Sequence, residues 1–240
     1  MALYLNDLTS NANNLTNNGA TDITTALPFT QATHAAKVVS ASTQYLTAAD
    51  ANQLSVSTTG KMTWEFWLKV TSLNDNNYAI WKGVGSNFEY QIIVGNSSGQ
   101  ITTSLFSLVG NARYTHASAN SVIGTGTWYH IAVTIDDTLA FNQTNLQMYV
   151  DEVEKTNITA GASGNALGNG TAALDIGRRT DTLAYGDFQI CDLRIWNTIR
   201  TSTQLANNKN QYLVGSESGL VAYYPLGLPT TGGAFLLNYL

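Results

Sequence analysis

The stretch Met62–Val70 constrains the fold more than any other feature of the sequence. Every second side chain in it is apolar, and this set is Met62, Trp64, Phe66 and Leu68. The alternate positions carry Thr63, Glu65, Trp67 and Lys69. Successive side chains of a strand point to opposite faces, so the pattern is typical of a half-buried β-strand. Such a strand must lie over a core.

A second stretch, Trp128–Asp136, has the same period. Its apolar face carries Tyr129, Ile131, Val133 and Ile135. Two long strands of this kind suggest the inner faces of a β-sandwich. Between them, Phe88–Val94 and Gln100–Leu108 flank the short polar loop Gly95–Gly99, which indicates a hairpin. Antiparallel strand order is therefore expected.

Four separated segments resemble, in their order and spacing, the laminin-G-like and pentraxin-like branch of the concanavalin A-like lectin/glucanase superfamily. They are Met62–Lys69, Gly126–Ile135, Leu146–Asp151 and Asp192–Asn197. The resemblance implies an all-β fold, a two-sheet antiparallel jelly-roll sandwich. Thr201 and Gln204 form a capping-box pattern, which predicts one short C-terminal helix. A fold hosts many functions, so the resemblance leaves the activity open.

The length of 240 residues favours one large domain. We expect an N-terminal strand and Asn/Thr-rich lead-in over residues 1–39, the laminin-G-like jelly roll over residues 40–227, and an apolar tail over residues 228–240. Within the lead-in, residues 1–8 are predicted to form a short edge strand and Asn11–Thr25 a loop. The single cysteine, Cys191, is predicted to be buried.

The charge pattern argues against nucleic acid as a partner. Only 11% of the residues are charged, the net charge is −5, and the longest basic run is Arg178-Arg179. No run approaches the ~18 apolar residues that span a bilayer, so no membrane insertion is expected. The N-terminus shows no signal peptide. We expect a virion or extracellular surface location, reached either by release on lysis or after removal of a leader.

The carboxylates do not form the pattern that glycoside hydrolysis needs. Hydrolysis requires two carboxyl groups about 5–10 Å apart, and the glucanases of the superfamily carry Glu-x-Asp-x-x-Glu, which is missing here. Glu65 and Glu89 are isolated and are expected on solvated strand faces. His34, His116 and His130 stand without a nucleophile elbow. We expect no catalytic residue and no enzymatic activity, and a glycoside hydrolase is the disfavoured alternative.

Candidate binding residues are few. The positions that could contact a glycan are Trp67, Trp81, Asn87 and Tyr185. An exposed ring could stack on a sugar, and the alternative for both tryptophans is packing in the core. The resemblance also implies loop ligands for Ca²⁺ near Asn87 and Asp181. The neighbouring Arg178 and Arg179 oppose a bound cation, so no cofactor is expected, with Ca²⁺ as the open alternative.

Apolar residues near both chain ends are candidates for docking onto a partner. They are Leu3, Leu5, Phe235, Leu236 and Leu237. Exposed apolar segments are unfavourable in water, so we expect them to dock either against their own domain or against a partner, which would be another copy of the chain in a homo-oligomer or another virion protein. The sequence therefore favours a non-catalytic structural or interaction protein, such as a capsid decoration, fibre or tail-associated subunit of a phage. The alternative is a lectin-like adhesion module that binds surface glycans, and the two roles are compatible.

Overall fold

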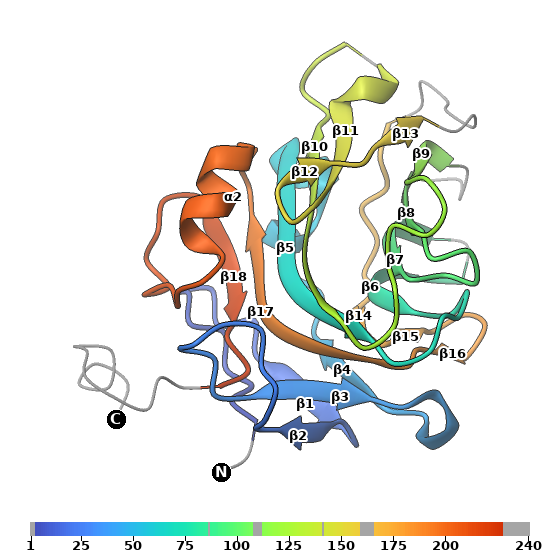
Figure 1. Ribbon diagram of the computed structural model, residues 1–240. Coiled ribbons are helices and arrows are strands. Elements are labelled where there is room, and N and C mark those ends of the chain that lie inside the picture. The colour runs from blue at the N-terminus through green and yellow to red at the C-terminus, as the bar shows by residue number, and fades with distance from the viewer. Residues whose placement is uncertain (1–2, 86, 108–111, 141, 159–165, 228–240) are drawn as a thin grey trace.

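Two eight-stranded antiparallel sheets pack face to face in the computed structural model (Figure 1). The structure describes residues 3–85, 87–107, 112–140, 142–158 and 166–227. The predicted fold class, an all-β two-sheet antiparallel jelly-roll sandwich, is confirmed. Among the described residues, no helix has both the length and the apolar character that crossing a bilayer requires.

The first sheet has the order β12-β11-β10-β5-β17-β3-β2, with β18 also paired to β17. Its strands are β2 (Thr21–Ile23), β3 (Ala35–Val38), β5 (Lys61–Val70), β10 (Trp128–Asp136), β11 (Leu146–Val150), β12 (Val153–Glu154), β17 (Phe188–Trp196) and β18 (Leu220–Tyr224). Strand β5 lies between β10 and β17, with Phe66 opposite Ile131 and Trp64 opposite Ile195. The two stretches with alternating patterns are therefore neighbours within one sheet.

The second sheet has the order β1-β4-β14-β6-β7-β8-β9-β13. Its strands are β1 (Leu15–Asn18), β4 (Tyr45–Ala48), β6 (Tyr78–Val84), β7 (Asn87–Val94), β8 (Ile101–Phe106), β9 (Ala112–Ala117), β13 (Asn157–Ile158) and β14 (Leu174–Ile176). A small hairpin pairs β15 (Arg178–Arg179) with β16 (Ala184–Tyr185). The helices are α1 (Val56–Thr59) and α2 (Ser202–Asn208), and short 3-10 turns lie at Ser40–Ser42, Asn52–Leu54 and Gln143–Asn145.

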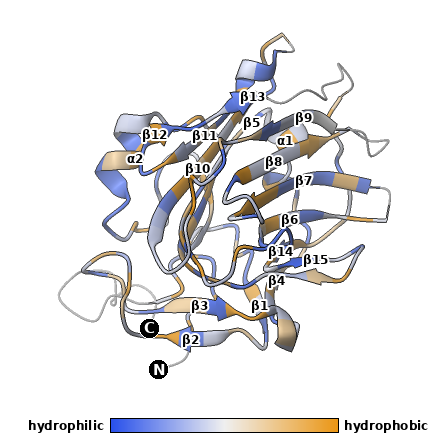
Figure 2. Cartoon of the chain, turned by 45° about the vertical axis from the view of Figure 1, so that its right-hand side comes forward, coloured by the Kyte–Doolittle hydropathy of each residue, from blue (hydrophilic) through white to orange (hydrophobic). Residues whose placement is uncertain are grey.

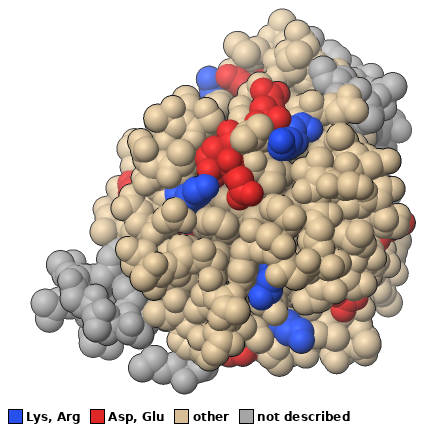
Figure 3. Space-filling model, in the orientation of Figure 1, with Lys and Arg blue, Asp and Glu red and all other residues tan. Residues whose placement is uncertain are grey.

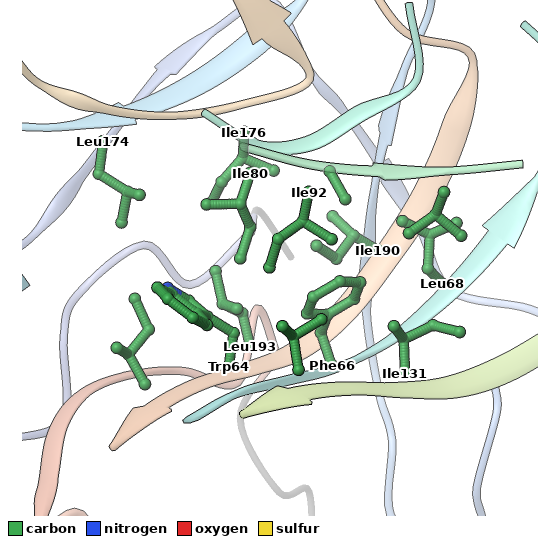
Figure 4. Close-up of a cluster of buried hydrophobic side chains, with 14 of the residues drawn as sticks. Trp64, Phe66, Leu68, Ile80, Ile92, Ile131, Leu174, Ile176, Ile190 and Leu193 are labelled. Atoms are coloured by element: carbon green, nitrogen blue, oxygen red, sulfur yellow. The ribbon is translucent and has the colours of Figure 1, made fainter. Parts of the chain in front are cut away.

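Apolar and polar residues alternate along the strands, as the hydropathy colouring of Figure 2 shows. The face of the molecule drawn in Figure 3 is largely uncharged, and Lys, Arg, Asp and Glu atoms gather at a few places on it. The inward side chains of the two sheets meet in one large core (Figure 4). There Trp64, Phe66 and Leu68 of β5 face Ile80 and Ile92 of the other sheet, and all five are 0% exposed. Burial stabilises each such side chain by about 1.5–3 kcal/mol.

The N-terminal region differs from the prediction. Residues 3–8 form no strand. Tyr4 makes an isolated antiparallel β-bridge with Leu226, in which the Tyr4 N–H donates to the Leu226 carbonyl oxygen at 3.3 Å. The predicted loop Asn11–Thr25 contains β1 and β2, one in each sheet. Asn and Thr dominate these strands, so composition alone indicated a loop. Their partner strands hold them in place.

Helix α2 begins as predicted. The Thr201 hydroxyl accepts from the Gln204 N–H at 3.2 Å, and the Gln204 side chain accepts from the Thr201 N–H at 3.0 Å. The helix ends at Asn208, and the apolar residues Tyr212 and Leu213 lie beyond it. The one-turn helix α1 was not expected, and it lies in the connection that precedes β5.

Candidate functional site

Three loops at one end of the sandwich enclose a groove of about 550 Å³. The loops are residues 71–77, 95–100 and 118–127, which join β5 to β6, β7 to β8, and β9 to β10. Because consecutive strands run antiparallel, these three connections emerge at the same end. The lining residues are Leu73, Ser97, Ser98, Gly99, Asn120, Ser121, Ile123, Gly124 and Thr125.

The backbone of the groove is held by hydrogen bonds between its own loops. The Ser121 N–H donates to the Ser98 carbonyl and the Ile123 N–H to the Gly99 carbonyl, each at 2.9 Å. The Gly124 N–H donates to the Tyr129 hydroxyl at 3.2 Å. These bonds join the second loop to the third and the third loop to β10. The walls are therefore positioned before any ligand arrives.

Gly99 allows the close approach of two of these loops. Its φ is +67°, and a Cβ placed there would lie 2.7 Å from the Ile123 carbonyl oxygen. Any other residue would be strained by the left-handed backbone and would also push against this carbonyl. Glycine is therefore needed at position 99 both for the backbone conformation and for the close packing of the two loops.

Polar side chains of the groove remain available for a ligand. Within the described part of the chain, no intramolecular hydrogen bond involves the side chains of Ser98, Asn120, Ser121 or Thr125. Hydroxyl and amide groups both donate and accept. Leu73, which is 39% exposed, supplies an apolar wall. No charged side chain is among the nine lining residues, so the groove suits an uncharged, polyhydroxylated molecule.

Asp75 lies next to the groove without lining it. Its Oδ1 accepts from the Ser97 N–H at 2.9 Å. The backbone N–H of Ser97, followed by its hydroxyl, holds the pKa of Asp75 below its ordinary value. The carboxylate is therefore charged at neutral pH, at the rim of an otherwise neutral site.

The two tryptophans singled out from the sequence are buried. Trp67 is 7% exposed and Trp81 is 0% exposed. The Trp67 Nε1–H donates to the Lys209 carbonyl at 2.8 Å, beneath the segment that follows α2. The guanidinium of Arg179 lies 4.6 Å from the centre of the Trp81 ring and covers it. A sugar could reach either ring only by displacing these neighbours, and the packing role fits both positions.

Asn87 and Tyr185 lie away from the groove. Asn87 is exposed at the start of β7, at the far end of that strand from the groove. Tyr185 is partly exposed on β16, with its ring 6.3 Å from that of Tyr45. Neither residue lines the groove, and the structure does not bring the four predicted glycan contacts together. The lining residues were missed because Ser, Asn, Thr and Gly in a loop are the ordinary residues of turns.

Asp181 makes an ion pair. Both of its carboxylate oxygens accept from Arg179, at 2.6 and 2.8 Å, and this hydrogen bonding lowers the pKa of Asp181. The described residues contain no group of three His, Cys, Asp or Glu side chains that could hold a metal ion. Asp181 thus belongs to no group of three such side chains within the described chain.

The outer face of the first sheet is buried around Glu65, which corrects the expectation for this residue. Glu65 is 0% exposed and accepts from the Trp196 Nε1–H at 2.8 Å and from Arg194 at 3.4 Å. Arg194, also 0% exposed, pairs with Asp192 at 2.6 Å. It further donates to the carbonyls of Asn208 and Gln211. The segment after α2 closes over these charges, so the cluster has no face open to a substrate.

A second set of charges ties this covering segment to the sheet. His130 Nδ1 lies 2.8 Å from Glu152, and Glu152 also pairs with Lys209. Burial opposes the charged carboxylate, but hydrogen bonds from His130 and Lys209 outweigh it and lower the pKa of Glu152. Lys209 directly follows α2. The helix is therefore anchored by side-chain charge as well as by its cap.

Glu89 is also buried rather than solvated. It is 3% exposed and pairs with the fully buried Lys82, which lies 2.6 Å from Asp50. Burial is the main cause that raises the pKa of Glu89. Strand periodicity assigned Glu89 to a face, but it could not show which groups cover that face. Cys191 is buried, as predicted.

The candidate docking residues near the N-terminus pack on their own domain. Leu3 and Leu5 are partly buried against the main core. Phe235, Leu236 and Leu237 lie outside the described residues. Leu3 and Leu5 are thus covered by their own domain, which explains their apolar character without a partner.

Comparison with solved structures finds the same fold in other proteins. The binding domain of Paraclostridial Mosquitocidal Protein 1 matches with a TM-score of 0.59 and 10% identity, over 86% of this chain and 51% of that chain. The binding domain of botulinum neurotoxin DC, in complex with SialylT, matches with a TM-score of 0.57 and 12% identity, over 88% and 52%. The chain thus spans about half the length of each of these two domains.

A third structure is matched along its whole length. It is domain 4 of AbnA, an extracellular arabinanase from Geobacillus stearothermophilus, in complex with arabinotriose. The TM-score is 0.54 and the identity is 15%, over 88% of this chain and 100% of that chain. At these identities the likeness concerns the fold alone.

Comparison of sequences gives the family. No curated protein matches the chain significantly. A sequence model described as the concanavalin A-like lectin/glucanases superfamily matches residues 40–206, which is more than half of the chain. This agrees with the jelly-roll topology observed above. The chain therefore belongs to the concanavalin A-like lectin/glucanase superfamily.

Proposed function

We propose that this protein is a non-catalytic carbohydrate-binding module whose binding site is the groove between residues 71–77, 95–100 and 118–127. The observation that carries the proposal is the chemistry of the lining. Four polar side chains that have no hydrogen-bond partner among the described residues project from a prearranged backbone, beside one apolar wall and with no charged residue in the lining. A sugar presents hydroxyl groups around an apolar ring face, which this arrangement complements.

Fold-level analogy adds support. The arabinanase domain that the chain matches over its full length was solved with arabinotriose. The neurotoxin binding domain was solved with SialylT, but the match covers 52% of that chain. We therefore give the arabinanase domain more weight as a guide to ligands, and neutral oligosaccharides are the class to test first.

The test is a glycan array followed by titration calorimetry with the oligosaccharide that binds best, and arabinotriose is included. Leu73→Ala should lower the affinity about 5-fold, because it removes apolar contact worth about 1 kcal/mol. Asn120→Ala should lower it as well, through the loss of hydrogen bonds. Leu139→Ala is the matched control, since Leu139 is 56% exposed and lies in the β10–β11 connection at the opposite end of the sandwich.

Equal affinities for all four proteins would place the sugar elsewhere, and no binding to any glycan would reject the proposed function. Incubation with a panel of β-glucans and arabinans tests the catalytic alternative. We expect no turnover, because the buried carboxylates Glu65 and Asp192 are closed over by the segment after α2.

As a second candidate we keep the structural subunit of a viral particle, displayed on a virion or another extracellular surface. Its support is the composition, with 11% charged residues and an Asn/Thr-rich polar set. The native mass of the full chain, measured by light scattering with and without residues 228–240, tests it. A discrete oligomer that falls to a monomer on truncation would favour this role, whereas a monomer in both forms would count against it.

A further inference from the structure

The groove differs from its rim in charge. Its nine lining residues are uncharged, and the charged side chain bonded directly to one of them is Asp75, through the Ser97 N–H at 2.9 Å. The hydrogen bonds from Ser97 lower the pKa of Asp75, so the rim carries a negative charge at neutral pH. A ligand in the groove must lie near this carboxylate.

The cations of the neighbouring segments lie outside the lining of the groove. Arg178 pairs with Asp175 at 2.9 Å, and Arg179 makes two hydrogen bonds to Asp181. The Lys69 ammonium lies 5.1 Å from the centre of the Trp128 ring. Among the described residues Asp75 itself makes no ion pair within 4 Å. An anionic ligand would therefore meet a negative charge and find no cation in the lining of the groove.

From this geometry, and resting on the proposed function, we infer that the groove selects neutral oligosaccharides and that Asp75 excludes sialylated, sulfated and uronate-containing ones. For two negative charges about 8 Å apart, Coulomb repulsion weakens binding about 2-fold in bulk water and about 30-fold at a protein surface of lower effective dielectric. Salt screens such a repulsion over a distance of about 8 Å at physiological ionic strength. The discrimination should therefore shrink as salt is added.

The experiment uses an array on which each neutral oligosaccharide, arabinotriose included, stands beside a sialylated, sulfated or uronate counterpart. The proteins are the wild type, Asp75→Asn and Glu154→Gln. The Asn side chain retains the oxygen that accepts from the Ser97 N–H, so the first variant removes the charge and keeps the loop bond. Glu154 is exposed on β12, outside the groove lining, and its replacement changes the net charge by the same amount.

We expect the wild type and Glu154→Gln to bind the neutral member of each pair at least about 2-fold more tightly than its anionic counterpart. Asp75→Asn should reduce this gap in affinity between the neutral and the anionic member. The gap should also narrow for the wild type in 1 M NaCl. Equal or stronger binding of the anionic members by the wild type would overturn the inference while leaving the proposed function intact. An unchanged gap in Asp75→Asn would overturn the role of Asp75. A chain that binds no glycan at all would fail the proposed function itself.

Discussion

Arg194 shows how this sandwich holds a charge in its interior. The guanidinium is 0% exposed and is surrounded by Glu65, Asp192 and the carbonyls of Asn208 and Gln211. Removing an ion from water is unfavourable by several kcal/mol unless its partners replace the lost hydration. Here two carboxylates and two carbonyls replace part of the lost hydration, while the Arg194 Nε–H has no hydrogen-bond partner among the described residues. The side chain therefore links β17 to β5 and to the segment that covers them.

Replacing Arg194 should be strongly destabilising. Arg194→Met leaves Glu65 and Asp192 buried without their cation, which should lower the free energy of unfolding by about 3–5 kcal/mol. Urea unfolding followed by tryptophan fluorescence measures the change. Lys61→Met is the control, because the Lys61 side chain is 41% exposed in its pair with Asp136 and should lose less than about 1 kcal/mol. Similar losses in both variants would contradict the assignment of Arg194 to a buried network.

Asp192 should make the stability depend on pH. Burial is the main cause that raises the pKa of Asp192 from 3.8 to about 6. The folded protein thus holds this proton more tightly than the unfolded chain. The stability that follows from this is fully present below about pH 4 and is lost as the pH rises through about 6, by up to about 3 kcal/mol.

The variant Asp192→Asn lacks this titration. Its free energy of unfolding minus that of the wild type should therefore increase between pH 4 and pH 6, as measured by urea midpoints across that range. Asp75→Asn provides the opposite sign when the urea series is extended below pH 4, because the pKa of Asp75 is lowered and its contribution to stability is lost as the pH falls below its ordinary value of 3.8. A difference for Asp192→Asn that stays constant with pH would contradict the raised pKa.

At the scale of elements, the groove depends on loops that are bonded to one another rather than on any strand. Gly99 is the position at which two of these loops touch, since a Cβ there would meet the Ile123 carbonyl at 2.7 Å. Gly85 also has a left-handed backbone, with φ +58°, but a Cβ there would meet nothing within 4 Å. Substitutions at these two glycines therefore distinguish the effect of backbone strain from the effect of a lost contact between loops.

Gly99→Ala should therefore damage the groove, and Gly85→Ala should not. Both variants carry the strain of a non-glycine residue at positive φ, about 1 kcal/mol each. Only Gly99→Ala also pushes the third loop away from the second, which should lower glycan affinity and the melting temperature together. Titration calorimetry and thermal unfolding of both variants provide the comparison. Equal affinities would show that the loop contact is not needed for binding.

The sequence predicted elements better than it predicted their surroundings. The alternation in Met62–Val70 identified β5 and its core face, because period 2 is a local property of the chain. It did not reveal that Glu65 and Trp67 are buried too, because the segment that covers them follows β17, more than a hundred residues later. A charged residue on the second face of a strand was expected to be solvated, whereas tertiary contacts bury it.

The groove was missed for a related reason. Each of its loops consists of residues that are common in turns, and no single loop contains a motif. A signal was nevertheless present in the predicted strand order. Connections that alternate along an antiparallel chain must meet at one end, so the order of the strands is sufficient to group the loops after β5, β7 and β9. The hydrogen-bonding side chains of these three loops could then have been recognised as one candidate site.

At the scale of the whole molecule, the few charged residues are placed unevenly. Charged residues make up only 11% of the chain, and several of them are buried in the sandwich, namely Asp7, Glu65, Lys82, Glu89, Asp175, Asp192 and Arg194. The surface is correspondingly poor in charge, as the face in Figure 3 illustrates. Encounter with a neutral ligand should therefore depend little on ionic strength, in contrast to the discrimination against anions set by Asp75.

The bridge between Tyr4 and Leu226 brings the first and last described parts of the chain to within one backbone hydrogen bond, 3.3 Å. A polypeptide that enters and leaves a domain at adjacent points can be spliced into a surface loop of another protein without stretching either of them. The domain from residue 4 to residue 226 has the geometry of such an insert. A fibre or scaffold could carry it as a side branch, with its own main chain resuming where the branch began.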